Sequence, residues 1–276
     1  MALANYAALQ AALVKSRTNF WLDAQDRSST SSTDEVTLSS YALDGGSHHA
    51  LGDELAAPTT AVSLSYSTDP LWSFPHPVGS AVHVTQVRCG ADSDSGRAAG
   101  ILIDRLGHTG GLSGTVATAQ TTNLPTAALP TRATGGAGVM AALQIYTTLG
   151  ATNANVTCSY TNQSGTAART GTAEFVITPI STLVYPFTLE GADSGVRSVE
   201  SVTLSVSTGT VGDFGVLLYK PLMVVSPGSG AMIATPTDGL VRWNNPIEAE
   251  AVLEFLYDGA VAPPDETSTL FHYANF

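Results

Sequence analysis

A period-two alternation of apolar and hydroxyl-bearing residues runs through the chain from residue 62 onward. Three stretches share one order of residue types: VSLSYS at 62–67, VTCSYT at 156–161 and VTLSVS at 202–207. Successive side chains of a β-strand point to opposite faces of its sheet, so each stretch predicts a strand with a buried apolar face and a Ser/Thr face. The turns around the three do not match, which favours a common way of building strands over an internal repeat.

Further strands are predicted where short apolar runs lie between turn-rich segments. They cover residues 81–89, 99–106, 138–148, 172–177, 183–189 and 213–222. The run at 139–146 is also compatible with a helix, because periodicity does not separate the two structures in so short an apolar run. Many strands at short spacing without intervening helices predict a mainly β chain. We therefore expect an antiparallel β-sandwich or jelly-roll-like body over residues 61–224.

The first 60 residues differ from this body and predict a short helix followed by a polar arm. Residues 3–15 place apolar side chains, among them Leu3, Tyr6 and Leu13, on one helical face. Such a helix could dock on a partner or pack on its own domain. Residues 23–60 are polar and rich in Gly, Ser and Pro, which predicts an extended arm with one short strand near residues 36–38.

The last segment, residues 225–276, is predicted to be irregular before a final alternating stretch and an aromatic tail. Apolar and acidic residues alternate in IEAEAVLEFLYDG, and the chain ends with Phe271, Tyr273 and Phe276. Exposed aromatic ends tend to be buried against something, either the same domain or a neighbouring subunit. The candidate assembly contacts are therefore Leu3, Tyr6, Leu13, Phe271, Tyr273 and Phe276.

Charge and composition exclude several classes of partner. Hydrophobic residues make up 43% of the chain and charged residues only 12%, with a net charge of −12 against 11 basic residues. The basic residues are scattered singly, so we expect no nucleic-acid partner and no binding to acidic membranes. The opening MALANYAALQAALVKSR lacks the pattern of a secretory signal, and no stretch approaches the length of an apolar membrane span.

The cysteines and glycosylation sequons are interpreted as features of a scaffold. Two cysteines, Cys89 and Cys158, are too few for a disulfide framework, and Cys158 lies in a strand pattern where a buried free thiol is expected. The sequons at Asn155 and Asn162 are expected to arise by chance in a chain so rich in Ser and Thr.

No catalytic or metal-binding constellation stands out from the background. GAGVMA (136–141) lacks the preceding strand of a dinucleotide fingerprint, and the surroundings of Ser113 do not form a nucleophile elbow. DSDSG (92–96) matches only half of a calcium-binding loop. His48 and His49 are consecutive residues whose side chains point in different directions on most backbones, so they are awkward as ligands of one metal ion. We expect no enzyme activity, no cofactor and no metal, with a serine esterase as the weakest alternative.

Residues 104–222 resemble structural proteins of tailed-bacteriophage virions. The cues are LGATNANVTCSYTNQSGTAART (149–170) and SVTLSVSTGTVGDFGV (201–216), which are phrases rather than chemical motifs. The resemblance implies a virion component assembled in the bacterial cytoplasm and carries over no functional residues.

Within the virion, two positions remain open from the resemblance. The first is a capsid-associated decoration or minor head protein on the outer surface of the particle. Its partners would be the major capsid protein or other virion proteins. It is also expected to form a homo-oligomer, with a trimer as the expected state. The alternative is a tail or fibre-base protein that binds host carbohydrate or a receptor through loops such as DPLWSFPHP (69–77).

Overall fold

The computed structural model describes most of the body and strands from both ends of the chain. The described residues are 18–24, 38–41, 62–63, 82–91, 100–122, 124, 129–175, 179, 183–209, 212–225, 251, 253–258 and 267–275. Within them the only helical element is η1 (Thr131–Ala133), a 3-10 turn. The prediction of a mainly β chain is confirmed, and every pairing between named strands is antiparallel.

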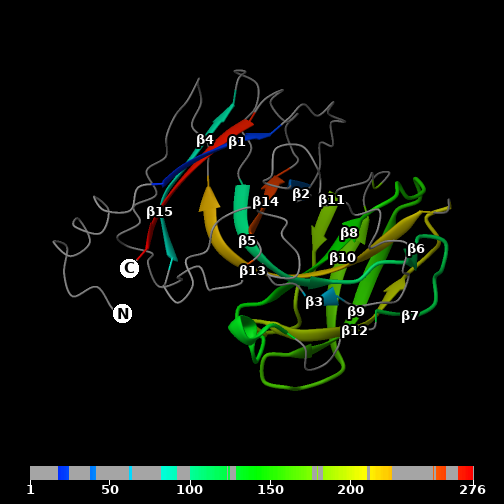
Figure 1. Cartoon of the computed structure of the whole chain (residues 1–276). Coiled ribbons are helices and arrows are strands. Elements are labelled where there is room, and N and C mark those ends of the chain that lie inside the picture. The colour runs from blue at the N-terminus through cyan, green and yellow to red at the C-terminus, as the bar shows by residue number, and fades with distance from the viewer. Residues whose placement is uncertain are drawn as a thin grey trace.

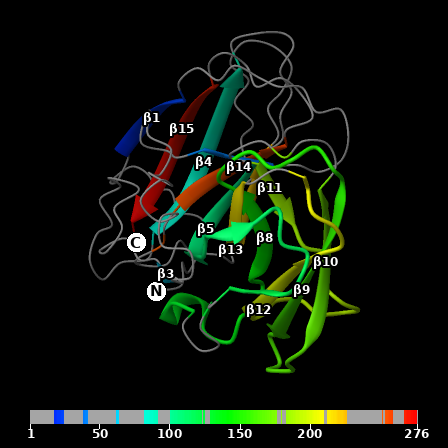
Figure 2. The ribbon, with the colours of Figure 1, turned by 90° about the vertical axis from the view of Figure 1, so that its right-hand side faces the viewer.

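The strands form three sheets, which Figure 1 shows from one side. The first sheet has the order β1-β15-β4, the second β10-β9-β12-β7, and the third β3-β5-β14-β2-β11-β8-β13-β6. Their bounds are β1 (Thr18–Ala24), β2 (Leu38–Tyr41), β3 (Val62–Ser63), β4 (Val82–Ala91), β5 (Gly100–His108), β6 (Leu112–Ser113), β7 (Gln120–Thr121), β8 (Met140–Ile145), β9 (Ala154–Asn162), β10 (Arg169–Phe175), β11 (Leu183–Pro186), β12 (Val196–Leu204), β13 (Asp213–Val225), β14 (Leu253–Asp258) and β15 (Thr267–Asn275). In Figure 2 strands of the third sheet lie between the other two sheets.

The third sheet closes on itself, because β5 pairs with β13 in addition to its neighbour β14. The pairings run from β5 through β14, β2, β11, β8 and β13 back to β5, so these six strands form a ring. Two register shifts on the β5–β13 ladder, after Leu218 and after Pro221, supply local bending of the kind that closed sheets use.

Two hydrophobic cores follow from this closure. One lies inside the ring and consists of residues from five of its strands, Ile103, Ala142, Val184, Leu217, Tyr219 and Leu256. The other lies between the outer face of the ring and the four-stranded sheet β10-β9-β12-β7, and it includes residues of both, such as Leu143 of β8 and Val156 of β9. The four-stranded sheet packed on the third sheet is the sandwich that the sequence predicts.

Strand β8 resolves the ambiguity between helix and strand at residues 139–146. Ala141, Leu143 and Ile145 belong to the sandwich core, whereas Ala142 belongs to the core inside the ring. Because both faces of β8 are buried, its sequence MAALQI is nearly continuously apolar and shows no alternation.

Of the three alternating stretches in the body, VSLSYS is described only at residues 62–63, which form β3. Of the other two, one is a strand throughout and the other only in part. In VTCSYT the apolar residues Val156, Cys158 and Tyr160 are buried on β9, and Cys158 is a free thiol, as predicted. The strand prediction for VTLSVS is wrong for residues 205–207, because β12 ends at Leu204 and Val206 is exposed in the connection that follows. Alternation continues past the last residue of the ladder, so pattern alone overextends this strand.

Segments from both ends of the chain enter these sheets. β2 pairs with β11 and β14, so it lies in the ring next to a C-terminal strand. A short strand is expected near residues 36–38, and β2 begins at Leu38. β1 pairs with β15. The predicted helix at 3–15, with Leu3, Tyr6 and Leu13, lies outside the described residues, and the division of the chain at residues 60 and 224 stays a prediction.

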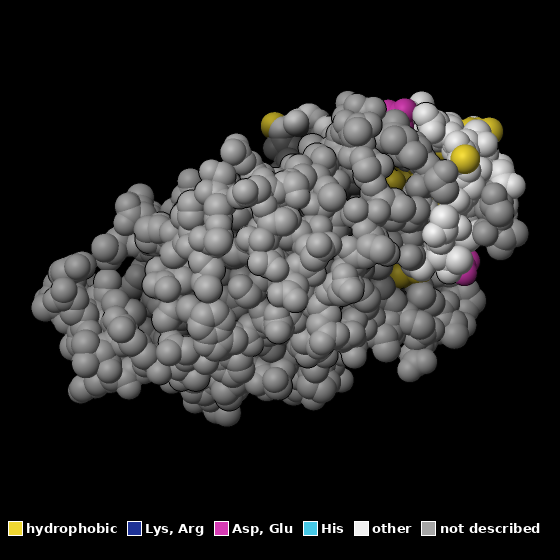
Figure 3. All heavy atoms as spheres, turned by 90° about the horizontal axis from the view of Figure 1, so that it is seen from above, with side chains coloured by type: hydrophobic (Ala, Val, Ile, Leu, Met, Phe, Trp, Pro, Cys, Tyr) yellow, Lys and Arg dark blue, Asp and Glu magenta, His cyan; other side chains and the backbone are white. Residues whose placement is uncertain are grey.

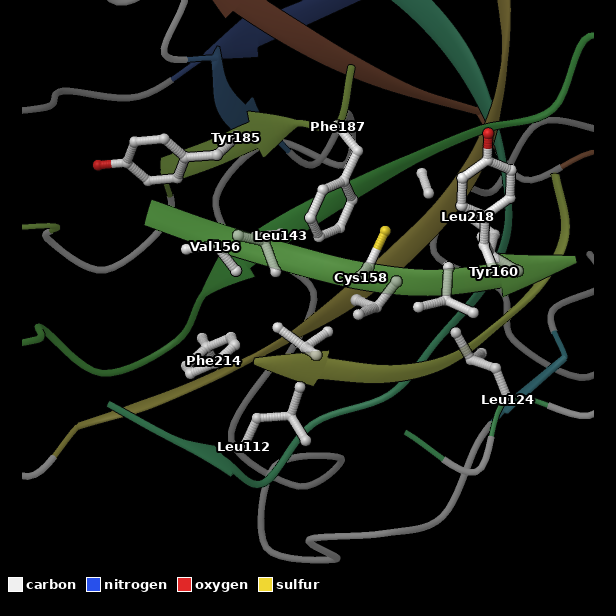
Figure 4. Close-up of a cluster of buried hydrophobic side chains, with 14 of the residues drawn as sticks. Leu112, Leu124, Leu143, Val156, Cys158, Tyr160, Tyr185, Phe187, Phe214 and Leu218 are labelled. Atoms are coloured by element: carbon white, nitrogen blue, oxygen red, sulfur yellow. The ribbon is translucent and has the colours of Figure 1, made fainter. Parts of the chain in front are cut away.

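A tight contact inside the sandwich predicts a non-additive pair of substitutions. Gly171 of β10 lies opposite Cys158 of β9, and a Cβ atom on Gly171 would lie 2.7 Å from the Cys158 Sγ and 3.5 Å from the Phe187 Cβ; Figure 4 shows Cys158 and Phe187 in this core. We expect Gly171→Ala to lower the free energy of unfolding by about 1–3 kcal/mol through overpacking. Cys158→Ala removes the clashing sulfur, so the double variant should lose less stability than the sum of the two single variants. Urea denaturation of the four proteins measures this, and strictly additive losses would contradict it.

Burial also predicts that the Cys158 thiol is unreactive in the folded protein. Burial raises the pKa of this thiol to about 12, so almost none of it is thiolate at pH 8. Brief treatment with iodoacetamide at pH 8, followed by peptide mass spectrometry, should leave Cys158 unlabelled in buffer and label it in urea. Labelling at equal rates in both conditions would contradict its burial.

Candidate functional site

The outer face of the four-stranded sheet is a surface of hydroxyl side chains. On β9 the buried residues alternate with Thr157, which is exposed, and with Ser159 and Thr161, which are half-buried. The neighbouring strands continue the pattern on the same face. We call this surface the hydroxyl face, and its members are Thr157, Ser159, Thr161, Thr170, Thr172, Ser201 and Thr203.

Strand register arranges these hydroxyls in rows across the sheet. Thr157 lies between Thr172 of β10 and Thr203 of β12, which gives one row of three threonines. A second row runs parallel to it and consists of Thr170, Ser159 and Ser201. Neighbouring hydroxyls are therefore about 4.8 Å apart across the strands and about 6.7 Å apart along them.

The chemistry of the hydroxyl face suits noncovalent contact. Each hydroxyl group can donate and accept hydrogen bonds, and short side chains on a sheet lose little conformational entropy when a partner covers them. Two carboxylates adjoin the face. Glu174 follows Thr172 on the same face of β10 and is exposed. Glu200 Oε1 accepts hydrogen bonds from the Thr161 hydroxyl at 2.7 Å and from the Ser198 hydroxyl at 2.6 Å. Glu200 thereby orients hydroxyl groups at one margin of the surface.

The outer edge of this sheet is closed against strand addition. Backbone hydrogen bonds join Thr172 of the edge strand β10 to Thr188 in both directions, at 3.0 and 2.8 Å. The Thr170 amide donates to Glu190 Oε2 at 2.8 Å. An open edge strand can pair with a strand of another chain. Because these contacts occupy the edge at β10, such pairing is blocked there, and another molecule would have to contact the face of the sheet instead.

At one end of the sandwich, Asp193 is the centre of a polar network. Asp193 Oδ2 accepts from the Tyr160 hydroxyl at 2.7 Å and from Arg169 Nε at 2.8 Å, and Oδ1 accepts from Asn162 Nδ2 at 2.8 Å. Arg169 also forms an ion pair with Glu190 at 2.9 Å. The Tyr160 hydroxyl and the Arg169 guanidinium hold the pKa of Asp193 below its usual value. The network fastens the β9–β10 hairpin to the segment that precedes β12.

The same network explains Asn162, one of the two sequon residues. Its Oδ1 accepts hydrogen bonds from the amides of Ser164, at 3.0 Å, and Thr166, at 2.9 Å, and the residue is buried. Asn162 therefore organises the turn after β9, and its amide nitrogen is engaged by Asp193 rather than presented to solvent. The second sequon residue, Asn155, is exposed on β9.

A second polar cluster lies in the buried wall of the ring and is closed to solvent. Arg105 is only 1% exposed, and it donates through Nε to His108 Nδ1 at 3.2 Å and through Nη2 to Gln144 Oε1 at 2.8 Å. Beside it, Asp104 forms a buried ion pair with Arg132 at 2.7 Å. These contacts satisfy charges that would otherwise destabilise the interior, and they are supports of the fold rather than a surface for a ligand.

The structure describes two of the six predicted assembly residues. Phe271 and Tyr273 lie on β15, the middle strand of the first sheet, where Phe271 is opposite Phe20 of β1 and Val87 of β4. The backbone around these two aromatic residues is thus paired on both sides within the same chain. Phe276, like the three N-terminal residues of the set, lies outside the described residues, and the role of all six in assembly stays a prediction.

The sequence motifs considered for chemistry take structural roles where they are described. In GAGVMA, Gly136 and Gly138 have positive φ angles, and a Cβ on Gly136 would lie 2.5 Å from the Val196 carbonyl oxygen, so glycine permits a close backbone approach. The Ser113 hydroxyl lies 3.0 Å from the Thr115 hydroxyl. Residues 92–96, His48 and His49 lie outside the described residues.

The described part of the chain shows neither a metal site nor a membrane-spanning helix. Within it, no group of three or more His, Cys, Asp or Glu residues could hold a metal ion. The helices of that part include none with the length and apolar character needed to cross a membrane.

Comparison with known proteins identifies no family. No family model matches the chain, and no curated protein matches it. Weak structural matches include the infectious bursal disease virus Gx strain, with 11% identity over 93% of this chain and 64% of that chain and a TM-score of 0.18. The VP2 subviral particle of the same virus matches with 11% identity over 95% of this chain and 41% of that one, with a TM-score of 0.12. The chain spans less than two thirds of either protein, and such TM-scores carry no argument.

The Asp193 network predicts a pH-dependent contribution to stability. A carboxyl group whose pKa is lowered by folding stabilises the protein above its unfolded pKa of about 3.9, and this contribution is lost as the pH falls through the lower folded value. We expect Asp193→Asn to be less stable than the wild type at pH 7 and the difference to shrink toward pH 3. Thermal unfolding at both pH values measures it, with Glu174→Gln on the exposed surface of β10 as the matched control. A difference that is the same at both pH values would contradict the network.

Proposed function

We propose that this chain is a non-enzymatic structural component of a tailed-bacteriophage virion, a decoration or minor head protein that binds the outer surface of the capsid. The observation that carries the proposal is the hydroxyl face, a surface of Ser and Thr side chains on a β-sandwich whose adjacent sheet edge at β10 is closed. Its partner would be the major capsid protein or another virion protein.

Three further features support this proposal. The phrases at 149–170 and 201–216, which resemble virion proteins, coincide with strand β9 and its turn and with the end of β12 and the start of β13. A sandwich with two buried cores gives the stable body that an external particle protein needs. The net charge of −12 suits the outside of a capsid better than its DNA-facing side.

The hydroxyl face can account for attachment without strong charge. A row of threonines can form many weak hydrogen bonds with another polar β surface, and its short side chains let the two backbones approach closely. The many copies in a particle strengthen attachment further through multivalency. Replacing central threonines with arginine would introduce two long charged side chains per copy and prevent such an approach.

Purified particles of the phage that encodes the chain test the proposal. Mass spectrometry should detect the protein in the particles, and cryo-electron microscopy should place it on the outside of the head. In particles assembled with the double variant Thr157→Arg and Thr172→Arg, occupancy should fall about tenfold or more, because desolvating unpaired charges opposes binding. Ala167→Arg, in the exposed turn between β9 and β10, is the matched control and should keep wild-type occupancy.

Absence of the protein from particles would overturn the proposal. Its presence at the tail, together with binding to host glycans on an array, would replace it with the alternative of a tail or fibre-base receptor-binding protein.

A further inference from the structure

One end of the ring interior is polar. Ala142 of β8 and Leu217 of β13 belong to the core inside the ring. Because side chains alternate between the two faces of a strand, Gln144 lies on the same inward face as Ala142. The register partner of Gln144 on β13 is Gly215, which lies on the same face as Leu217. The inward face therefore changes from apolar residues to Gln144 toward the end of β8.

The chain that leaves β5 covers this polar end. Thr109 follows the last residue of β5, and its amide donates to the Val216 carbonyl oxygen at 2.9 Å. A Cβ atom on Gly215 would collide with the Thr109 carbonyl oxygen, so glycine permits this close approach. The Tyr146 hydroxyl donates to the same carbonyl oxygen at 2.9 Å. Register partners direct their side chains to one face, so Thr109 lies over the face that carries Gln144.

The covered end is closed to solvent. Gln144 and Thr109 are both 0% exposed, and the neighbouring Arg105 and His108 are buried as well. Figure 3 shows neither the dark blue of arginine nor the cyan of histidine on the described surface seen from above. A molecule bound at this end would therefore be enclosed by protein.

Two buried polar atoms at this end have no hydrogen-bond partner among the protein groups that the structure describes. They are Gln144 Nε2 and Thr109 Oγ1. The amide orientation of Gln144 is fixed, because Arg105 Nη2 donates to Gln144 Oε1 at 2.8 Å and a guanidinium group can only donate. Gln144 Nε2 is therefore a donor that needs an acceptor. Nearly all such buried groups in folded proteins bond to protein or to ordered water, since leaving them unpaired is destabilising.

The chemistry of these two atoms identifies the ligand. A metal ion does not fit, because the amide nitrogen of Gln144 offers hydrogens and no lone pair for coordination. The complete burial of both residues excludes a larger organic ligand. A water molecule fits, because it can accept from Gln144 Nε2 and can either donate to or accept from the Thr109 hydroxyl.

We propose that an internal water molecule binds at this end of the ring and bridges Gln144 Nε2 and Thr109 Oγ1. The water joins strand β8 to the segment that leaves β5, and so completes the polar cover of the ring. The inference goes beyond the proposed virion function and does not depend on it.

A high-resolution crystal structure of the full chain tests the inference directly. Electron density should show one water molecule at about 2.7–3.2 Å from both atoms. Crystals grown in bromide should show no anomalous signal at this position, because a halide can accept hydrogen bonds but cannot donate one. Direct protein partners for both atoms would overturn the inference, as would a bromide signal at the site.

Deuterium relaxation dispersion tests the same water in solution, since it detects water molecules that stay inside a protein. Thr109→Val keeps the shape of the side chain and removes its hydroxyl, so the dispersion amplitude should fall by the equivalent of one water molecule. Thr109→Ser keeps the hydroxyl and should retain the wild-type amplitude. Thr152→Val makes the same change as Thr109→Val at an exposed position and should also match the wild type.

Circular dichroism establishes that the variants are folded before their amplitudes are compared. A folded Thr109→Val variant with the wild-type amplitude would overturn the inference. If Thr109→Val does not fold, the wild-type crystal structure decides, because it requires no substitution.

Discussion

Strands β8 and β13 bury both of their faces, and the architecture of the whole chain depends on this constraint. Ala141 and Leu143 of β8 contribute to the sandwich core, while Ala142 between them contributes to the core inside the ring. A strand that is apolar on both faces has no side that water can cover, so it requires a layer on each. The four-stranded sheet supplies one layer, and closure of the ring through β14, β2 and β11 supplies the other.

Polar side chains fall into two groups, those buried in the wall of the ring and those at the surface of the sandwich. Arg105 and the Asp104–Arg132 pair are enclosed in the wall of the ring, where hydrogen bonds and ion pairing offset the cost of burial. At the surface, Arg169 and Glu190 lie beside Asp193 at one end of the sandwich. The hydroxyl face lies on the outer side of the four-stranded sheet. Buried charges thus support the fold, while Ser and Thr side chains form the outward surface of the four-stranded sheet.

Individual residues show which structural features the local sequence pattern predicts and which it does not. The alternation in VTCSYT predicts the buried face of β9 and the hydroxyl residues opposite it, because the period of a strand is set by its own backbone. The same alternation in VTLSVS fails at Val206, because the ladder ends at the pair of Leu204 and Val156 although β9 begins two residues earlier at Ala154. The Asp193 network joins side chains that are 24 to 33 residues apart, and no local signal links them. The buried charges of the DR pair at 104–105 interrupt an apolar strand, which could have indicated a polar cluster but not its partners.

The alternation of residue types is enough to predict a chain of antiparallel strands and the buried face of β9, because period-two alternation is a local property of extended backbone. The sequence does not show that β5 meets β13 to close a ring, or that β2 from the predicted arm lies beside β14 from the tail; only the folded structure reveals these pairings. These outcomes depend on pairing between strands far apart in the chain. Backbone hydrogen bonds are the same for every partner, so only the fit of two buried faces over the whole sheet selects among them.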